Sequence, residues 1–142
     1  TFSKAWGLAA LRLGMAFASQ DIIDYMNKVK PPYNVNLATQ QLALQALDNI
    51  QWVNEHIRET VKSRNELVAA LQAVKTVQHI YPTDANFILV KMDNAKQMYD
   101  YLVQQGTIVR DRSKVELCEG CLRITIGTTQ ENQTLIQQLQ QL

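Results

Sequence analysis

The sequence is poor in residues that bind metal ions, since its 142 residues include only two cysteines and two histidines. Cys118 and Cys121 form a C-E-G-C motif, which is half of a typical zinc site, and no second pair of cysteines or histidines completes it. A redox-active pair usually opens a helix after a strand, whereas this pair precedes a predicted strand. We therefore expect two plain thiols in a loop, as in a reducing cytoplasm, with a metal or redox role as the less favoured alternative.

A strong charge imbalance and a long apolar run are also missing. Fourteen Lys and Arg residues face thirteen Asp and Glu residues, for a net charge of +1 at pH 7. This balance gives no electrostatic reason to expect nucleic acid or an anionic membrane as a partner. No apolar stretch approaches the length of a membrane span. A hydrophobic fraction of 46% in 142 residues suits one ordinary globular domain with a core.

Hydrophobic periodicity predicts a mixture of helices and strands. Helices are expected at 20–29, from a cap at Asn36 to about 48, from about 50 to 74, from 95 to Gly106, and at 129–141 after a capping box. Strands are expected at 12–18, 77–81, 85–90, 107–110 and 122–126, with 85–90 buried on both faces. This order predicts an α/β fold, a sheet of three or four strands with helices mainly on one face.

The first fourteen residues, T-F-S-K-A-W-G-L-A-A-L-R-L-G, combine one lysine, two hydroxyls and one arginine. Apolar neighbours would strip water from the amine of Lys4, which disfavours its charged form and suits it to a Schiff base with an aldehyde. Thr1, Ser3 and Arg12 could then hold an anion such as phosphate. An aldehyde that carries a phosphate is pyridoxal phosphate. On spacing alone, a short loop with a solvated lysine is the favoured alternative.

One arginine stands out in the predicted strand 122–126. Leu122, Ile124 and Ile126 alternate with Arg123 and Thr125, so Arg123 should leave the core and face either solvent or a cleft. The pattern gives these two readings about equal weight.

The opening run resembles the lysine segment of fold-type I pyridoxal-phosphate aminotransferases, and more narrowly that of the histidinol-phosphate aminotransferase family. Three later stretches agree in order and spacing, namely P-P-Y-N-V-N at 31–36, D-A-N-F-I-L-V at 84–90, and T-I-V-R-D-R with C-L-R-I-T-I-G-T within 107–128. The resemblance implies that residues 1–35 are the end of a large cofactor-binding domain and that residues 36–142 are the small C-terminal domain. It also implies a cytoplasmic homodimer.

The resemblance implies a role for each cofactor residue. Lys4 would bond the aldehyde of pyridoxal phosphate and move a proton between the substrate and the cofactor. Arg12, Ser3 and, less surely, Thr1 would bind the cofactor phosphate. The aromatic residue over the pyridine ring, the aspartate on its nitrogen and the glycine-containing phosphate turn would all belong to sequence that precedes Thr1.

The resemblance also assigns the substrate. Arg123 would pair with the carboxylate of the amino acid, and Arg110 would help bind the phosphate of histidinol phosphate, with 2-oxoglutarate and glutamate as the other substrate pair. Asp111 could instead neutralise Arg110 or Arg112.

Family chains are more than twice as long as this one, so we expect a C-terminal fragment that is inactive alone and holds no ordered cofactor. An aromatic-amino-acid aminotransferase, a threonine-phosphate decarboxylase and a non-enzymatic module that binds an anion or a protein remain as alternatives.

Overall fold

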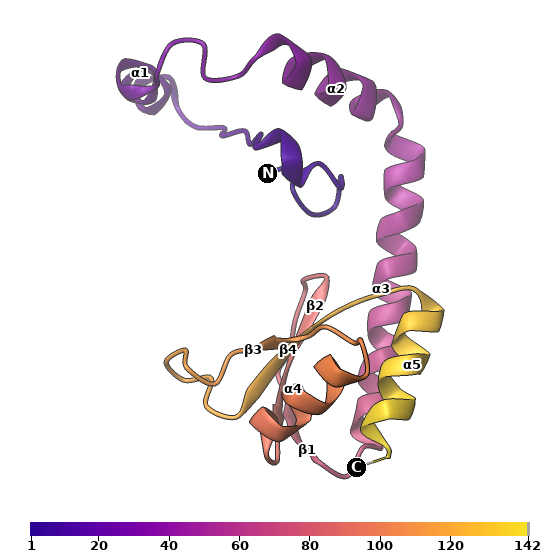
Figure 1. Ribbon diagram of the computed structural model, residues 1–142. Helices are drawn as coiled ribbons and strands as arrows, with labels where there is room; N and C mark the ends of the chain where they lie inside the picture. Colours follow the sequence, from indigo (N-terminus) through magenta and orange to yellow (C-terminus); the bar gives the residue numbers. More distant parts are fainter. Residues whose placement is uncertain (142) are drawn as a thin grey trace. The chain divides into compact units, whose positions relative to one another are not determined.

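The computed structural model describes residues 1–141. The chain divides into two compact units, Thr1–Ile57 and Arg58–Leu142 (Figure 1). We call these the N-terminal unit and the C-terminal unit and describe each by itself. The N-terminal unit contains the 3-10 helix η1 (Ala9–Leu11), α1 (Gln20–Val29), α2 (Leu37–Asp48) and the first part of α3 (Ile50–Gln72). The C-terminal unit contains the rest of α3, then β1 (Val77–Ile80), β2 (Phe87–Met92), α4 (Ala95–Gln104), β3 (Arg110–Asp111), β4 (Cys121–Thr125) and α5 (Thr129–Leu139).

The helices of the N-terminal unit lie where the sequence predicts them. Helix α1 has the predicted bounds, and the prolines that follow it exclude a longer helix. Helix α2 begins after Asn36, whose side-chain oxygen accepts a hydrogen bond from the Thr39 backbone N–H at 2.9 Å. This bond satisfies one of the free N–H groups of the first helical turn.

The strand predicted at residues 12–18 is wrong. In the described structure this segment is extended but is not part of a sheet, and its apolar side chains Met15 and Phe17 are 54% and 89% exposed. A strand needs a neighbour to pair its backbone N–H and C=O groups. The described residues of the N-terminal unit form no strand that could serve as that neighbour, so the apolar run alone was not enough to predict one.

The C-terminal unit is built on an antiparallel four-stranded sheet with the order β1-β2-β4-β3, which confirms the predicted strand number. Strand β2 starts at Phe87, two residues later than predicted, and β3 is only Arg110–Asp111 instead of 107–110. The central strands pair with Ile88 opposite Ile124 and Val90 opposite Leu122. These four side chains therefore point to the same face of the sheet and are almost fully buried.

All three helices of the C-terminal unit pack on that one face, as predicted. The core consists of the buried sheet residues together with apolar residues of the helices and of two loops, those after α3 and before β3: Leu67, Leu71, Val74, Ala95, Met98, Leu102, Val109, Leu135 and Leu139. Burying each Leu or Ile side chain stabilises the fold by about 1.5–3 kcal/mol relative to an exposed one. The expectation that β2 is buried on both faces is wrong, because buried residues alternate with half-buried Phe87, Leu89 and Lys91.

Helix α5 begins at the predicted capping box. The Thr128 side chain accepts from the Glu131 backbone N–H, and the Glu131 carboxylate accepts from the Thr128 backbone N–H at 2.7 Å. The Thr128 hydroxyl also donates to the Glu131 carboxylate at 2.9 Å. The two bonds that this carboxylate accepts lower the pKa of Glu131, the one from the Thr128 backbone N–H being the larger cause and the one from the hydroxyl the smaller. The cap holds the start of α5, the helix that supplies Leu135 and Leu139 to the core.

Candidate functional site

Residues 1–14 form a loop that closes on itself. The Phe2 N–H donates to the Leu13 carbonyl at 3.2 Å, and the Leu8 N–H donates to the Phe2 carbonyl at 3.1 Å. The Thr1 hydroxyl also reaches the Leu13 carbonyl at 3.3 Å. Phe2 is only 5% exposed and meets Trp6 edge to face, with 5.5 Å between ring centroids. These contacts hold the two ends of the loop beside each other.

Loop closure brings the two predicted phosphate-binding hydroxyls together. The oxygens of Thr1 and Ser3 lie 2.9 Å apart, and the Ser3 backbone N–H donates to the Thr1 hydroxyl at 3.2 Å. Lys4 follows directly and is exposed. Within this unit the apolar neighbours do not enclose the amine, because Phe2 turns inward while Lys4 stays in solvent.

Arg12 has an unusual backbone. It follows η1 with φ of +52°, in the left-handed region, which costs a non-glycine residue on the order of 1 kcal/mol. Its guanidinium Nη1 donates to the Ala9 carbonyl at 3.1 Å and the side chain is exposed. Within this unit, Arg12 is therefore exposed, and its side-chain hydrogen bond among the described residues is to the backbone of its own loop. Strained residues of this kind often occur at ligand-binding sites, which fits the assigned role.

The donors of this loop match the chemistry of pyridoxal phosphate. Paired hydroxyls and a guanidinium are the groups that bind a phosphate, and an exposed primary amine is the group that reacts with an aldehyde. Thr1, Ser3, Lys4 and Arg12 supply all of them from one short closed segment. The residues therefore fit the cofactor, although their assignment to it stays a prediction.

The C-terminal unit pairs the two predicted substrate arginines. Arg110 of β3 lies opposite Arg123 of β4 in the ladder, so both side chains leave the sheet on the same face. This is the face turned away from the core, since Leu122 and Ile124 on either side of Arg123 are buried. The predicted alternation along β4 is confirmed.

The arginine pair is suited to an anion. The Arg123 guanidinium carbon lies 4.9 Å from the centre of the Phe87 ring, which orients it from one side. Its Nε is buried and has no hydrogen-bond partner among the described residues. Like charges placed opposite each other in a ladder repel, so an anion shared by Arg110 and Arg123 would relieve the repulsion and supply the missing acceptor.

Two further cations belong to this face. The Arg112 N–H donates to the Cys121 carbonyl at 2.9 Å, which continues the β3–β4 ladder by one step. In the β2–β4 ladder, Cys121 pairs with Lys91. Together with Arg110 and Arg123 they give the face four positive charges, and no register position of this face in the described sheet carries an acid. Sequence reasoning missed Lys91, because only the pairing of β2 with β4 reveals its neighbours.

Asp111 does not neutralise either neighbouring arginine. Its ladder partner is Leu122, so it starts toward the other face, and its carboxylate accepts from the Ser113 N–H at 2.9 Å. Hydrogen bonds from the Ser113 side chain and backbone lower the pKa of Asp111. Its negative charge is thus satisfied locally.

Other parts of the described chain offer weaker sites. Cys118 and Cys121 are free thiols, and residues 1–141 contain no cluster of three or more His, Cys, Asp or Glu residues that could hold a metal ion. No helix in the described part of the chain is long and apolar enough to span a membrane.

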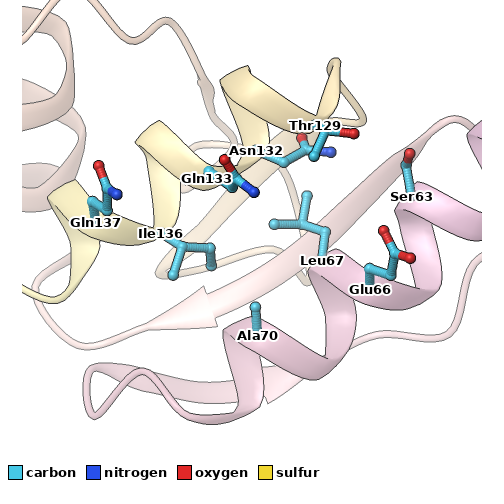
Figure 2. A pocket seen from close by; sticks show the side chains of 9 residues that line it. All are labelled: Ser63, Glu66, Leu67, Ala70, Thr129, Asn132, Gln133, Ile136 and Gln137. Atoms are coloured by element: carbon cyan, nitrogen blue, oxygen red, sulfur yellow. The ribbon is translucent and has the colours of Figure 1, made fainter.

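A pocket of about 340 Å³ lies between α3 and α5 (Figure 2). Its lining comprises Ser63, Glu66, Leu67, Ala70, Thr129, Asn132, Gln133, Ile136 and Gln137. It contains no cation to bind a phosphate or carboxylate.

Comparison with known sequences gives a consistent result. The family described as "Aminotransferase class I and II" matches residues 1–139. The chain is 53% identical over 136 residues to a histidinol-phosphate aminotransferase of Cytophaga hutchinsonii, covering 96% of this chain and 39% of that protein. It is 46% identical to the enzyme of the same name from Flavobacterium johnsoniae, covering 100% of this chain and 41% of that protein. The chain thus spans about two fifths of the length of these relatives.

Solved structures share the fold. An L-threonine-O-3-phosphate decarboxylase from Porphyromonas gingivalis is 25% identical with a TM-score of 0.87, over 99% of this chain and 44% of that one. A histidinol-phosphate aminotransferase from Sinorhizobium meliloti, solved with pyridoxal-5'-phosphate, is 22% identical with a TM-score of 0.78, over 99% of this chain and 39% of that one. At this identity the second structure bears on the fold alone.

Proposed function

Because this chain belongs to the aminotransferase class I and II family, we propose that it forms the C-terminal part of a histidinol-phosphate aminotransferase. The intact enzyme would exchange an amino group between histidinol phosphate and 2-oxoglutarate in histidine biosynthesis. The fold is that of fold-type I pyridoxal-phosphate enzymes. The 44–53% identity to several relatives named histidinol-phosphate aminotransferase supports this substrate over others.

The observation that carries the proposal is the ladder pairing of Arg110 with Arg123 on the open face of the sheet. Each substrate of the proposed reaction carries an anionic group, and histidinol phosphate carries a phosphate with about −1.5 to −2 charges at neutral pH. A planar guanidinium binds phosphate or carboxylate oxygens in pairs, which gives both energy and orientation. Arg123, fixed by Phe87, would orient the substrate, and Arg110 would add the second fork for phosphate.

The loop of residues 1–14 would hold the cofactor. Pyridoxal phosphate supplies an aldehyde for the amine of the substrate and a ring that withdraws electrons from the bond to be broken. The Thr1 and Ser3 hydroxyls would donate to its phosphate, with Arg12 turning its guanidinium away from the Ala9 carbonyl to join them. The Nζ of Lys4 would take the proton from the substrate Cα and return a proton at the cofactor carbon C4′.

The alternative within the same fold is a threonine-phosphate decarboxylase, which the Porphyromonas gingivalis structure exemplifies. Its substrate, as named there, also carries a phosphate, so the arginine pair suits it as well. The two reactions differ in the bond that breaks at Cα, which the position of Arg123 alone does not select.

An assay of the full-length protein tests the proposal. With pyridoxal phosphate, histidinol phosphate and 2-oxoglutarate we expect glutamate to form at a rate of roughly 1–1000 per second, the ordinary range for enzymes. O-phosphothreonine should release no carbon dioxide above the background rate. Release of carbon dioxide without glutamate formation would replace the proposal with the decarboxylase.

We further propose that the enzyme acts as a cytoplasmic homodimer. The free thiols of Cys118 and Cys121 support a reducing compartment. Sedimentation of the full-length protein measures the oligomeric state directly, and a monomer at micromolar concentration would contradict the dimer.

A further inference from the structure

The connection between β3 and β4 is a chain of three tight turns. The Val115 N–H donates to the Arg112 carbonyl at 2.8 Å, the Cys118 N–H to the Val115 carbonyl at 3.0 Å, and the Cys121 N–H to the Cys118 carbonyl at 3.0 Å. Each bond joins the first and fourth residues of a four-residue turn. The backbone is therefore fixed from the end of one strand to the start of the next.

The last of these turns has a cysteine at its first and fourth positions. Residues in these positions have Cα atoms within about 7 Å of each other, and a disulfide needs a Cα separation of about 4.4–6.8 Å. Gly120, in the third position, has φ of +70°, the value that a type II turn requires there. The turn thus keeps the two Cα atoms within about 7 Å of each other, close to the range that a disulfide needs.

The two thiols differ in access. Cys118 is half-buried, whereas Cys121 is fully buried and its sulfur lies 3.8 Å from the Glu119 carbonyl. Burial raises the pKa of the Cys121 thiol, and the charge of the nearby Cys118 raises it further. A reagent from solvent therefore meets Cys118 first, and Cys121 is positioned to react second.

We propose that Cys118 and Cys121 form a reversible dithiol site that exchanges with small-molecule disulfides. The Cys118 thiolate attacks one sulfur of the small disulfide, whose S–S bond breaks and whose other half leaves and takes up a proton. The Cys121 thiol then loses its proton to solvent, and the resulting thiolate attacks the Cys118 sulfur. The Cys118 bond to the second half of the small disulfide breaks, and that half leaves and takes up a proton. The protein is oxidised by two electrons and the small disulfide is reduced to two thiols.

The dithiol site shares no residue with the loop of residues 1–14 and does not depend on the proposed function. Cys121 is the first residue of β4, and its carbonyl accepts from Arg112, so the disulfide would tie the turn to the strand that carries Arg123. In a reducing compartment such a disulfide would be transient.

The test uses the 142-residue chain with oxidised glutathione as the probe, followed by alkylation and intact-mass measurement. We expect the native chain to lose both free thiols and the mass of two hydrogen atoms, and to keep no glutathione. Cys121→Ser should trap glutathione on Cys118, whereas Cys118→Ser should gain none because the remaining thiol is buried. Equal reaction of Cys118→Ser and the native chain, or a native chain that retains glutathione, would overturn the proposal.

A matched pair of glycine variants distinguishes the effect of the turn geometry on disulfide formation from the effect of a general loss of structure. Gly120→Ala strains the turn between the cysteines, and Gly106→Ala introduces the same kind of strain, at φ of +78°, away from them. Ring closure after glutathione attack should slow several-fold in Gly120→Ala, so that the adduct accumulates, and should be unchanged in Gly106→Ala. Closure that is equally fast in both, or that occurs in the native chain only after urea unfolds it, would contradict a site built by this turn.

Discussion

The two units of this chain place their apolar side chains in opposite ways. The C-terminal unit buries Leu71, Ile88 and Leu102 completely between its sheet and its helices. The N-terminal unit leaves Phe17 89% exposed and Tyr33 97% exposed. Apolar surface left open on this scale usually belongs to an interface.

The difference assigns separate tasks to the units. The C-terminal unit has the core that a folding domain needs, and it presents its arginines on a rigid sheet. The N-terminal unit carries the loop of residues 1–14, which is the proposed cofactor site, on a segment with exposed apolar side chains. Substitutions in the N-terminal unit should therefore act on the chemical step. Substitutions in the C-terminal unit should act on stability or on substrate binding.

The largest effect is expected from the loop of residues 1–14, the proposed cofactor site. Lys4→Ala in the full-length enzyme should reduce turnover by about a thousand-fold or more, because no other group replaces the amine that moves the proton. Folding should be unaffected, since Lys4 is exposed. Single-turnover rates measure the loss, and Lys28→Ala, another exposed lysine of the same unit, is the control. Retained activity in Lys4→Ala would contradict the proposal that this loop holds the cofactor and that Lys4 moves the proton.

The contrast in burial can be measured as stability. Leu71→Ala should lower the free energy of unfolding by about 2–5 kcal/mol, because it opens a cavity in the core of the C-terminal unit. Leu44→Ala in α2, where the side chain is 63% exposed, should change it by less than about 0.5 kcal/mol. Urea titration of the chain followed by circular dichroism gives both values. Similar losses in the two variants would show that the units share one core.

The two arginines should separate by substrate. In the full-length enzyme, each lost charge-assisted contact is worth about 1.5–3 kcal/mol, or roughly ten- to a hundred-fold in kcat/KM. Arg123→Ala should lower kcat/KM for histidinol phosphate and for glutamate by similar factors. Arg110→Ala should lower kcat/KM for histidinol phosphate by the larger factor. Single-turnover rates with each amino donor make the comparison. Equal losses for both donors in Arg110→Ala would remove the reason to prefer a substrate with phosphate.

The smallest effect is expected at the α5 cap. Thr128→Ala should cost about 1 kcal/mol of stability at neutral pH, and Thr129→Ala, one residue further, should cost little. The lowered pKa of Glu131 stabilises the fold above the pH at which the unfolded carboxyl titrates, and this contribution is lost as pH falls through the folded pKa. The difference between Thr128→Ala and the native chain should therefore shrink in acid. A difference that stays constant down to pH 2 would exclude the carboxylate from the cap.

Local signals predicted most of the fold. Helix α1 ends before Pro31, α2 begins after Asn36, and α5 begins after Thr128, because each boundary depends on residues next to it. The strand at 12–18 failed because strand formation depends on a partner elsewhere in the chain. The burial of Phe2 beside an exposed Lys4 was not predicted for the same reason, since neighbours in sequence do not determine which side chain turns inward.

The site was predictable in part. The alternation around Arg123 identified its face, and the motif resemblance singled out Arg110. Strand register makes Arg110 and Arg123 direct ladder partners. It also places Lys91 and Arg112 on the same face. Register is set by long-range packing of β2 against β4, which no short window of sequence contains.

The strand order also bears on how the sheet assembles in time. β1 and β2, and likewise β3 and β4, are joined by short connections, while the central pair β2 and β4 is separated in sequence by α4 and β3. Contacts between nearby residues form within microseconds, and closure of longer loops is slower because more chain entropy is lost first. We therefore expect the hairpin that carries both arginines to form early. The join between β2 and β4, which brings Phe87 under Arg123, should come late and limit the folding rate.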